Sequence, residues 1–115
     1  MQVAQGGLAF TMIHPDELRR RLSYGERFAV IDARSESSRR SSGETMPGAI
    51  RLPADGILSH KAEIPRGRSL LLLADLAAQE SVALELLGDG YADVFLIEGG
   101  FDAFLRAGGP TEPIR

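Results

Sequence analysis

The apolar residues of this chain gather in short runs, and a helical pattern or a turn follows each of them. The runs at 9–13, 28–31, 70–74 and 94–97 are largely apolar, and 28–31 leads directly into Asp32. Continuous apolar runs of roughly four to eight residues are typical of strands that are buried on both faces of a parallel sheet. The pattern therefore predicts buried strands at these positions, with the run at 70–74 as the central one.

A shorter strand is predicted at 49–52, because the Pro47-Gly48 turn precedes it and Pro53 closes it. The polar stretch Ser35 to Glu44 is rich in serine and arginine, and its sequence is compatible with either a short helix or an irregular loop.

Three segments have the spacing or the end signals of helices. The first starts with Pro15 in its first turn and ends before Gly25. In the second, Val82, Ala83, Leu86 and Leu87 share one face. The third follows the Gly99-Gly100 turn and ends at 108–110.

Strands that alternate with helices predict an α/β fold, with a mainly parallel sheet of about five strands and helices on both faces. The chain has 115 residues, which fits one domain. We expect a loose N-terminal lead-in over residues 1–8 and a single domain over residues 9–112.

Charge and hydropathy narrow the set of partners. The net charge is −3 and no strongly basic field is present, so we expect no nucleic-acid partner. The longest apolar run is far shorter than a membrane span, and the N-terminus lacks the basic-then-apolar pattern of a signal peptide. We therefore expect a cytoplasmic protein with no membrane association.

The sequence contains no cysteine, which excludes disulfides, thiolate metal ligands and covalent sulfur chemistry carried by these residues. The histidines, His14 and His60, are far apart in sequence, and surface or helix-capping roles are expected for both. No metal site and no cofactor are predicted.

Several short motifs occur along the chain in a fixed order. Residues 29–34 end in Asp-x-Arg, and 43–50 is similar to a Gly-His-Ile-Pro-Gly-Ala stretch with one extra residue and no histidine. Pro53 follows, then 97–101 with Glu-Gly-Gly and 108–110 with Gly-Gly-Pro. With these motifs, over about residues 10–112, the chain resembles a single-domain rhodanese. The resemblance implies a three-layer α/β/α fold.

Most of the matching residues have structural explanations. We expect Asp32 and Arg34 to pair with one another or with backbone groups, because buried charges need partners. The glycines allow tight turns. The residues to which we assign such roles are Asp32, Arg34, Pro47, Gly48, Glu98, Gly99 and Gly100.

Active rhodaneses carry a Cys-x-x-x-x-Arg loop after the central strand, and its cysteine accepts a sulfur atom as a persulfide. Two placements of this chain on that loop are open. One puts Ala74 at the cysteine position and Gln79 at the arginine position. The other puts Asp75 and Glu80 there, but it turns Glu85 inward on the following helix.

In either placement the loop lacks the residues that sulfur transfer needs. There is no thiol, the arginine is replaced by a neutral or acidic side chain, and Ala77 or Ala78 stands at the loop glycine. Asp75 and Glu80 would each repel a bound anion by roughly 3 kcal/mol at about 5 Å. The degenerate loop consists of Ala74, Asp75, Leu76, Ala77, Ala78, Gln79, Glu80 and Ser81.

By resemblance, we expect a catalytically inactive regulatory or protein-interaction module, in sulfur or stress-related metabolism, with an unknown protein partner. Leu76, Ala77 and Ala78 would form an apolar rim for that partner. Arg39 and Arg40 are expected to supply charge near the same rim.

Three other functions are open. In the first, the loop keeps a pocket with a changed ligand and acts as a sensor of small anions. In the second, Ala74 replaces the cysteine of a working sulfurtransferase. In the third, Asp75 acts as a nucleophile beside a Mg²⁺ ion that Asp32 helps to hold.

Overall fold

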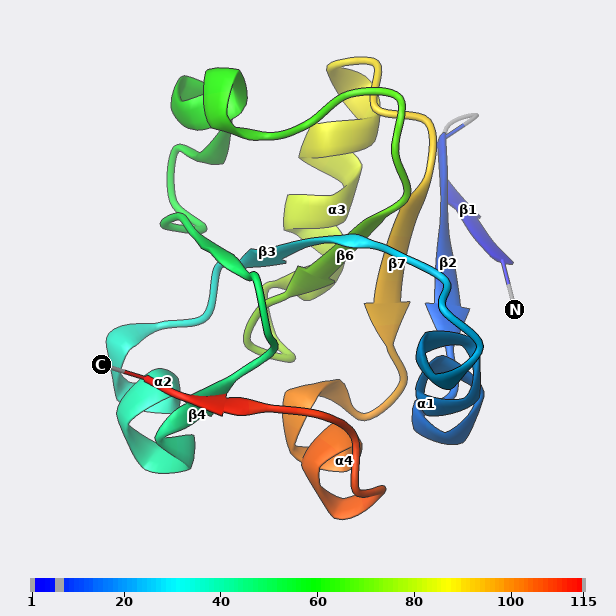
Figure 1. The fold of residues 1–115 in the computed structure, drawn as a ribbon. Coiled ribbons are helices and arrows are strands. Elements are labelled where there is room, and N and C mark those ends of the chain that lie inside the picture. Colours follow the sequence, from blue (N-terminus) through cyan, green and yellow to red (C-terminus); the bar gives the residue numbers. More distant parts are fainter. Residues whose placement is uncertain (1, 6–7, 115) are drawn as a thin grey trace.

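One mixed sheet runs through the molecule, and the computed structural model, which describes residues 2–5 and 8–114, shows how the chain builds it (Figure 1). Five neighbouring strands are parallel, and β1 pairs antiparallel with β2 at one edge. In spatial order the strands are β1 (Gln2–Gln5), β2 (Leu8–Ile13), β7 (Val94–Ile97), β6 (Leu70–Leu73), β3 (Ala29–Asp32) and β5 (Ile50–Arg51).

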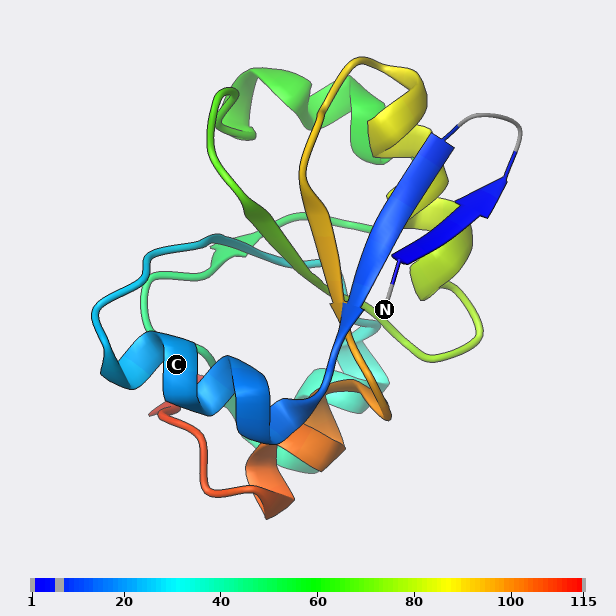
Figure 2. The same cartoon turned by 90° about the vertical axis from the view of Figure 1, so that its right-hand side faces the viewer.

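Helices cover both faces of this sheet, which makes the fold a three-layer one (Figures 1 and 2). The helix α1 (Pro15–Ser23) packs with α4 (Gly100–Arg106) on one face. On the other face lie α3 (Gln79–Gly88) and the 3₁₀ segment η1 (Ile57–Glu63). No helix in residues 2–5 and 8–114 is long and apolar enough to cross a membrane.

Two smaller elements complete the chain. The helix α2 (Glu36–Ser42) lies in the stretch for which the sequence left a helix or a loop open. Its first turn is capped by the Ser35 hydroxyl, which accepts a hydrogen bond from the Ser38 N–H, and Gly43 ends it with a positive φ of 66°. A short ribbon pairs β4 (Glu44–Thr45) with β8 (Glu112–Pro113).

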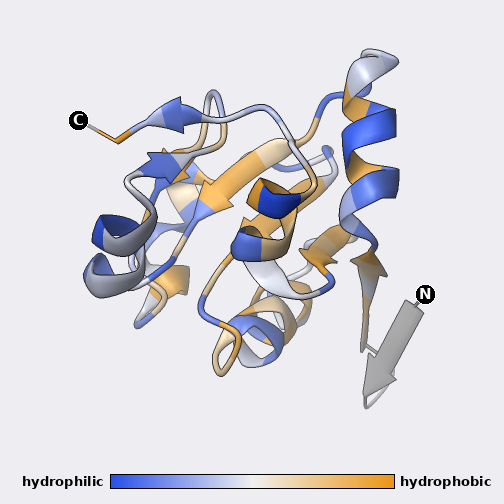
Figure 3. Ribbon diagram, turned by 90° about the horizontal axis from the view of Figure 1, so that it is seen from below, coloured by the Kyte–Doolittle hydropathy of each residue, from blue (hydrophilic) through white to orange (hydrophobic). Residues whose placement is uncertain are grey.

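The central strand β6 explains why the sequence shows an unbroken leucine run. Leu70 and Leu72 face the core under α3, whereas Leu71 and Leu73 face the core under α1 and α4. All four side chains are buried, because β6 lies between β7 and β3 and is covered on both sides. Figure 3 shows the central strands as the hydrophobic part of the molecule.

The predicted strands and helices are confirmed, and so is the five-stranded parallel sheet. The loose lead-in over residues 1–8 is wrong for Gln2–Gln5, which form β1, while residues 1, 6 and 7 lie outside the described residues. This strand contains two glutamines and no apolar periodicity, so its pairing is decided by the free edge of β2.

The two histidines have local roles. His14 is the N-cap of α1, and its Nδ1 accepts a hydrogen bond from the Asp16 N–H at 3.1 Å. His60 lies 3.3 Å from a carboxylate oxygen of Glu63. The expected capping role of His14 is therefore confirmed.

Candidate functional site

A cavity of about 380 Å³ opens at the carboxyl end of the sheet, where β3, β6 and β7 finish. The strand ends bring together Arg34, Ala74 and Gly99, which are far apart in the sequence. One side of α2 lines the cavity with Ser37, Ser38 and Ser41. Ligands of parallel α/β proteins usually bind at this end of the sheet.

At the end of β3, Asp32 and Arg34 form a buried ion pair. The Arg34 Nε donates to Asp32 Oδ1 at 2.9 Å, and Nη2 donates to Oδ2 at 2.8 Å. Only 1% of Asp32 and 4% of Arg34 are exposed. The pairing that the Asp-x-Arg motif predicts is therefore present, in the bidentate geometry that arginine favours.

Asp32 and Arg34 also form hydrogen bonds with other groups. Asp32 also accepts hydrogen bonds from the Thr45 hydroxyl at 2.9 Å and from Arg39 Nε at 3.3 Å. Arg34 donates to the Glu44 carbonyl at 2.7 Å, and its guanidinium lies 4.2 Å from the centre of the Phe101 ring. Arg34 lines the cavity, but its guanidinium is buried and already hydrogen-bonded to Asp32 and Glu44.

The same contacts set the charge state of Asp32. Burial alone would raise the pKa of its carboxyl group, but the hydrogen bonds and the charge of Arg34, with a hydrogen bond from Thr45, outweigh burial and lower it. A carboxylate held in this way is a structural group. The two-aspartate Mg²⁺ site is therefore not supported, because Asp32 is committed to Arg34, Arg39 and Thr45.

At the end of β6 the chain carries no reactive group. Ala74 follows the strand directly, is buried and lines the cavity. The next residues wind into a turn in which the N–H groups of Ala78 and Gln79 donate to the Asp75 carbonyl at 2.8 and 2.9 Å. These two N–H groups point into the turn, so they are not available to a ligand in the cavity.

The Asp75 carboxylate fastens this turn to the neighbouring loop by accepting a hydrogen bond from the Ser35 N–H at 3.2 Å. Partial burial would raise the pKa of Asp75. Hydrogen bonds from Ser35 and Ser38, with the nearby charge of Arg34, lower it below the usual carboxyl value. The side chain therefore brings a negative charge to the cavity lining at neutral pH.

Of the two acids expected to oppose an anion, only Asp75 lines the cavity; Glu80 is exposed outside it. The second acid at the cavity is Asp102, in the first turn of α4, which the sequence analysis missed. Its position two residues after the Gly99-Gly100 turn was the available signal. Two carboxylates, beside one buried arginine that is already paired with Asp32, leave the lining unfavourable for anions.

The rim of the cavity is formed by Leu76, whose side chain is 62% exposed. Gly99 and Gly100 both have positive φ angles, and a Cβ atom on Gly100 would lie 3.0 Å from Leu76 Cδ2. Leu76 thus packs against Gly100 while most of its side chain stays open to solvent. Ala77 beside it is also exposed.

The expectation that Arg39 and Arg40 charge this rim is wrong for Arg39 and unsupported for Arg40. The Arg39 guanidinium turns towards β3, where it contacts Asp32 and, at 3.5 Å, Glu36. Arg40 is exposed and lies outside the cavity lining. Helix periodicity decides this outcome, because the residues of α2 that line the cavity are Ser37, Ser38 and Ser41.

The helix α3 buries Val82, Ala83, Leu86 and Leu87 and leaves Glu85 exposed. This is the orientation that placing Ala74 at the cysteine position requires. The choice between Ala74 and Asp75 as the equivalent of the cysteine stays a prediction. The described part of the chain contains no cluster of three histidine or carboxylate side chains that could hold a metal ion.

No protein-family model and no curated protein matches this sequence. Solved structures match over most of the chain. The crystal structure of Alr3790 from Anabaena sp. is 28% identical, with a TM-score of 0.71, over 89% of this chain and 82% of that one. The solution structure of the rhodanese-like domain of the same protein is 27% identical, with a TM-score of 0.71, over 90% and 79%. A rhodanese-related protein from Thermoplasma volcanium is 16% identical, with a TM-score of 0.70, over 90% and 98%.

Proposed function

We propose that this chain, a rhodanese-like domain without a cysteine, is a non-catalytic module of the cytoplasm that binds a protein partner through the Leu76 rim. By the same resemblance we place it in sulfur or stress-related metabolism, where it regulates rather than transfers sulfur. The observation that carries the proposal is an exposed leucine held over a cavity that has no nucleophile.

The geometry of the rim suits a protein contact. Leu76 and Tyr24 are the large hydrophobic side chains that are exposed within the described residues. A solvent-exposed leucine held against a glycine turn loses little side-chain entropy when a partner covers it, which favours binding. The cavity beside it would receive one apolar side chain of the partner.

The cavity is poorly suited to sulfur transfer. A persulfide mechanism needs a thiolate, and it needs N–H groups and cations that stabilise an anionic donor. Here the buried Ala74 offers no nucleophile, the Arg34 guanidinium is buried and paired with Asp32, and Asp75 adds negative charge. Each of these features acts against an anionic substrate.

A pair of charge substitutions tests the binding surface. The domain, Leu76→Arg and Tyr24→Arg are immobilised, and proteins retained from an extract of the source cells are quantified by mass spectrometry. Tyr24→Arg is the matched control, because it places the same charge on an exposed hydrophobic side chain at the C-cap of α1. We expect a partner that the domain and Tyr24→Arg retain and Leu76→Arg loses, with unchanged thermal unfolding.

Retention of the same proteins by Leu76→Arg would contradict the proposal.

A second function is favoured by one observation, the presence of a cavity of about 380 Å³ where the ligand site of an α/β domain lies. A small-ligand sensor would show saturable amide shifts at residues 74–81 when thiosulfate, sulfite or phosphate is added. Loss of partner binding without such shifts favours the protein-interaction role.

A further inference from the structure

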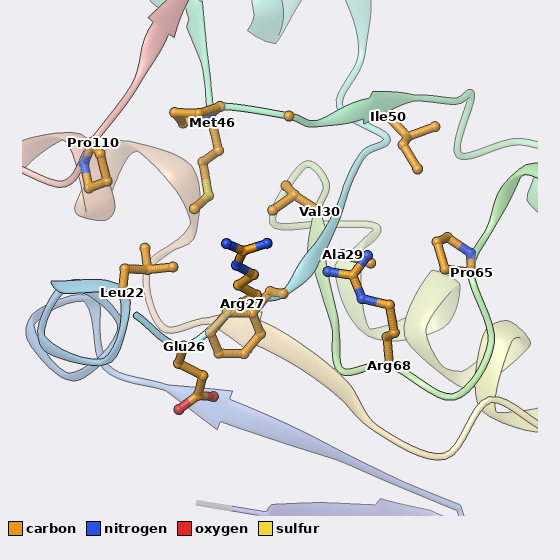
Figure 4. A pocket seen from close by; sticks show the side chains of 13 residues that line it. Leu22, Glu26, Arg27, Ala29, Val30, Met46, Ile50, Pro65, Arg68 and Pro110 are labelled. Carbon is orange, nitrogen blue, oxygen red and sulfur yellow. The ribbon is translucent and has the colours of Figure 1, made fainter. Parts of the chain in front are cut away.

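A second and larger cavity, of about 530 Å³, lies towards the opposite end of the sheet (Figure 4). It is bordered by the start of β3, the end of α1, the link between β4 and β5, and the segment before β6. No residue of its lining belongs to the cavity at Ala74. Its volume is in the range of sites that hold small organic ligands.

The walls of this cavity are apolar. Val30 of β3 and Leu22 of α1 face it from the sheet and the helix, and Met46 is buried beneath it. Prolines from three separate segments, Pro47, Pro65 and Pro110, complete the wall. Proline and aliphatic side chains offer no hydrogen bonds, so an occupant must bring an apolar body.

Two arginines at the cavity have no partner in the described part of the chain. Arg27 and Arg68 line it, are exposed, and form no hydrogen bond or ion pair there. Figure 4 shows the Arg27 guanidinium pointing into the space bordered by Val30, Met46 and Leu22, while the Arg68 side chain extends towards Ala29. Both positive groups therefore stand over apolar surface.

The acids nearby do not neutralise them. Glu26 also lines the cavity, but its carboxylate points away in Figure 4 and accepts hydrogen bonds from Arg21 at 2.6 and 2.8 Å. Asp93 borders a neighbouring hollow with Arg68 and lies 3.3 Å from the Ser69 hydroxyl. The cavity thus combines an apolar interior with two uncompensated cations, although the chain has a net charge of −3.

The geometry points to a binding site for a small amphipathic acid, a molecule with an apolar chain or ring and one carboxylate head. The apolar body would fill the space over Val30 and Met46. The carboxylate would accept charge-assisted hydrogen bonds from Arg27 and Arg68 at the mouth. This site goes beyond the proposed partner-binding role and shares no residue with the Leu76 rim.

Amide NMR spectra of the domain, recorded during titration with sodium decanoate below its micelle-forming concentration, test the site. We expect saturable shifts centred on Leu22, Val30 and Met46, with residues 74–81 unaffected. Decanol and decylamine are titrated in parallel, since they keep the apolar chain and replace the anionic head with a neutral or a positive one. Decanoate is expected to bind at least about tenfold more tightly than either, by the contribution of charge-assisted hydrogen bonds.

Charge-removing variants identify the head-group contacts. Arg27→Gln and Arg68→Gln are each expected to weaken decanoate binding by about tenfold and to leave decanol binding unchanged. Arg40→Gln is the matched control, because Arg40 is an exposed arginine outside both cavities. Leu22→Phe, which reduces the apolar space, is expected to weaken both ligands.

The site is overturned if decanoate causes no saturable shifts, or shifts elsewhere on the domain. Equal affinities for decanoate and decanol, or equal losses in Arg40→Gln and Arg27→Gln, would also overturn it. Because Arg27 and Arg68 are exposed, their glutamine variants are expected to fold. The Leu22→Phe variant tests the apolar half of the site independently of charge.

Discussion

The strands β3 and β6 are neighbours that end at the same edge of the sheet, but the segments that follow them differ in what holds them. After β3, Asp32 and Arg34 keep a complete buried network of hydrogen bonds. After β6, the position next to the strand holds Ala74, and the following turn uses N–H groups within itself. The difference separates residues that the fold needs from residues that only the chemistry needs.

The largest effect is expected from breaking the β3 network. Asp32→Asn leaves the buried Arg34 guanidinium without a countercharge, and removing one partner of a buried ion pair costs about 3–5 kcal/mol. We expect a loss of this size in the free energy of unfolding, measured by urea denaturation. Asp55→Asn, at an exposed aspartate, should change it by no more than about 0.5 kcal/mol. Equal effects of the two substitutions would contradict a structural role for Asp32.

The same pair predicts how stability depends on pH. Because the pKa of Asp32 is lower in the folded state, its contribution is fully present above the unfolded carboxyl value near about 4 and is lost as pH falls through the folded pKa. We therefore expect stability to drop below about pH 4, and to drop less steeply in Asp32→Asn. Denaturation curves of both proteins between neutral and acid pH measure this. If the free energy of unfolding falls equally with pH in the unmodified chain and in Asp32→Asn, other carboxylates cause the acid sensitivity.

The sequence predicted what repeated local patterns determine. The leucines of β6 form a strand because both faces are covered, and such burial leaves a continuous apolar run that can be read directly. The Asp32–Arg34 pair was also predictable, since the two residues are two positions apart and both need partners in a buried edge.

Features that depend on segments far apart in the sequence were not predictable. Arg39 was expected at the rim, but the rotation of α2 turns it towards Asp32. Asp102 was not considered, because the turn before it predicts the start of a helix and does not show that this helix begins beside the end of β6. The cavity at Arg27 and Arg68 is likewise built from segments that lie far apart in the sequence. In each case the missing information is tertiary packing, which local pattern does not contain.

A smaller effect is expected at the end of β6, from Asp75→Ala. This substitution removes the acceptor of the Ser35 N–H, a solvent-exposed hydrogen bond between the two strand ends, and should cost at most about 1 kcal/mol. Glu80→Ala, at the exposed acid of the same loop, should change stability by no more than about 0.5 kcal/mol. Urea denaturation of both variants makes the comparison. A loss as large as that of Asp32→Asn would mean that the β6 loop is as essential to the fold as the β3 network.

The smallest effect is expected from introducing a thiol. In Ala74→Cys one sulfur atom is added beside a cavity, so stability should change by less than about 1 kcal/mol. We expect no sulfur transfer from thiosulfate to cyanide above that of the unmodified chain. We also expect the alkylation rate of the Ala74→Cys variant to rise with pH. The pH dependence should give a thiol pKa near or above the ordinary value of about 8.5, because no free cation stabilises the thiolate. Ser81→Cys, with an exposed thiol, is the control for reactivity.

Sulfur transfer by Ala74→Cys would change the comparison between the two strand ends. It would mean that the β6 loop keeps its chemistry in latent form and that Ala74 alone silences it, as in a sulfurtransferase whose cysteine was replaced. Failure of Ala74→Cys, followed by partial activity when Gln79→Arg is added, would show instead that the loop lost its function in several steps. Asp75 would then limit the rate of sulfur transfer, because in both variants its carboxylate would repel the thiosulfate anion that donates the sulfur.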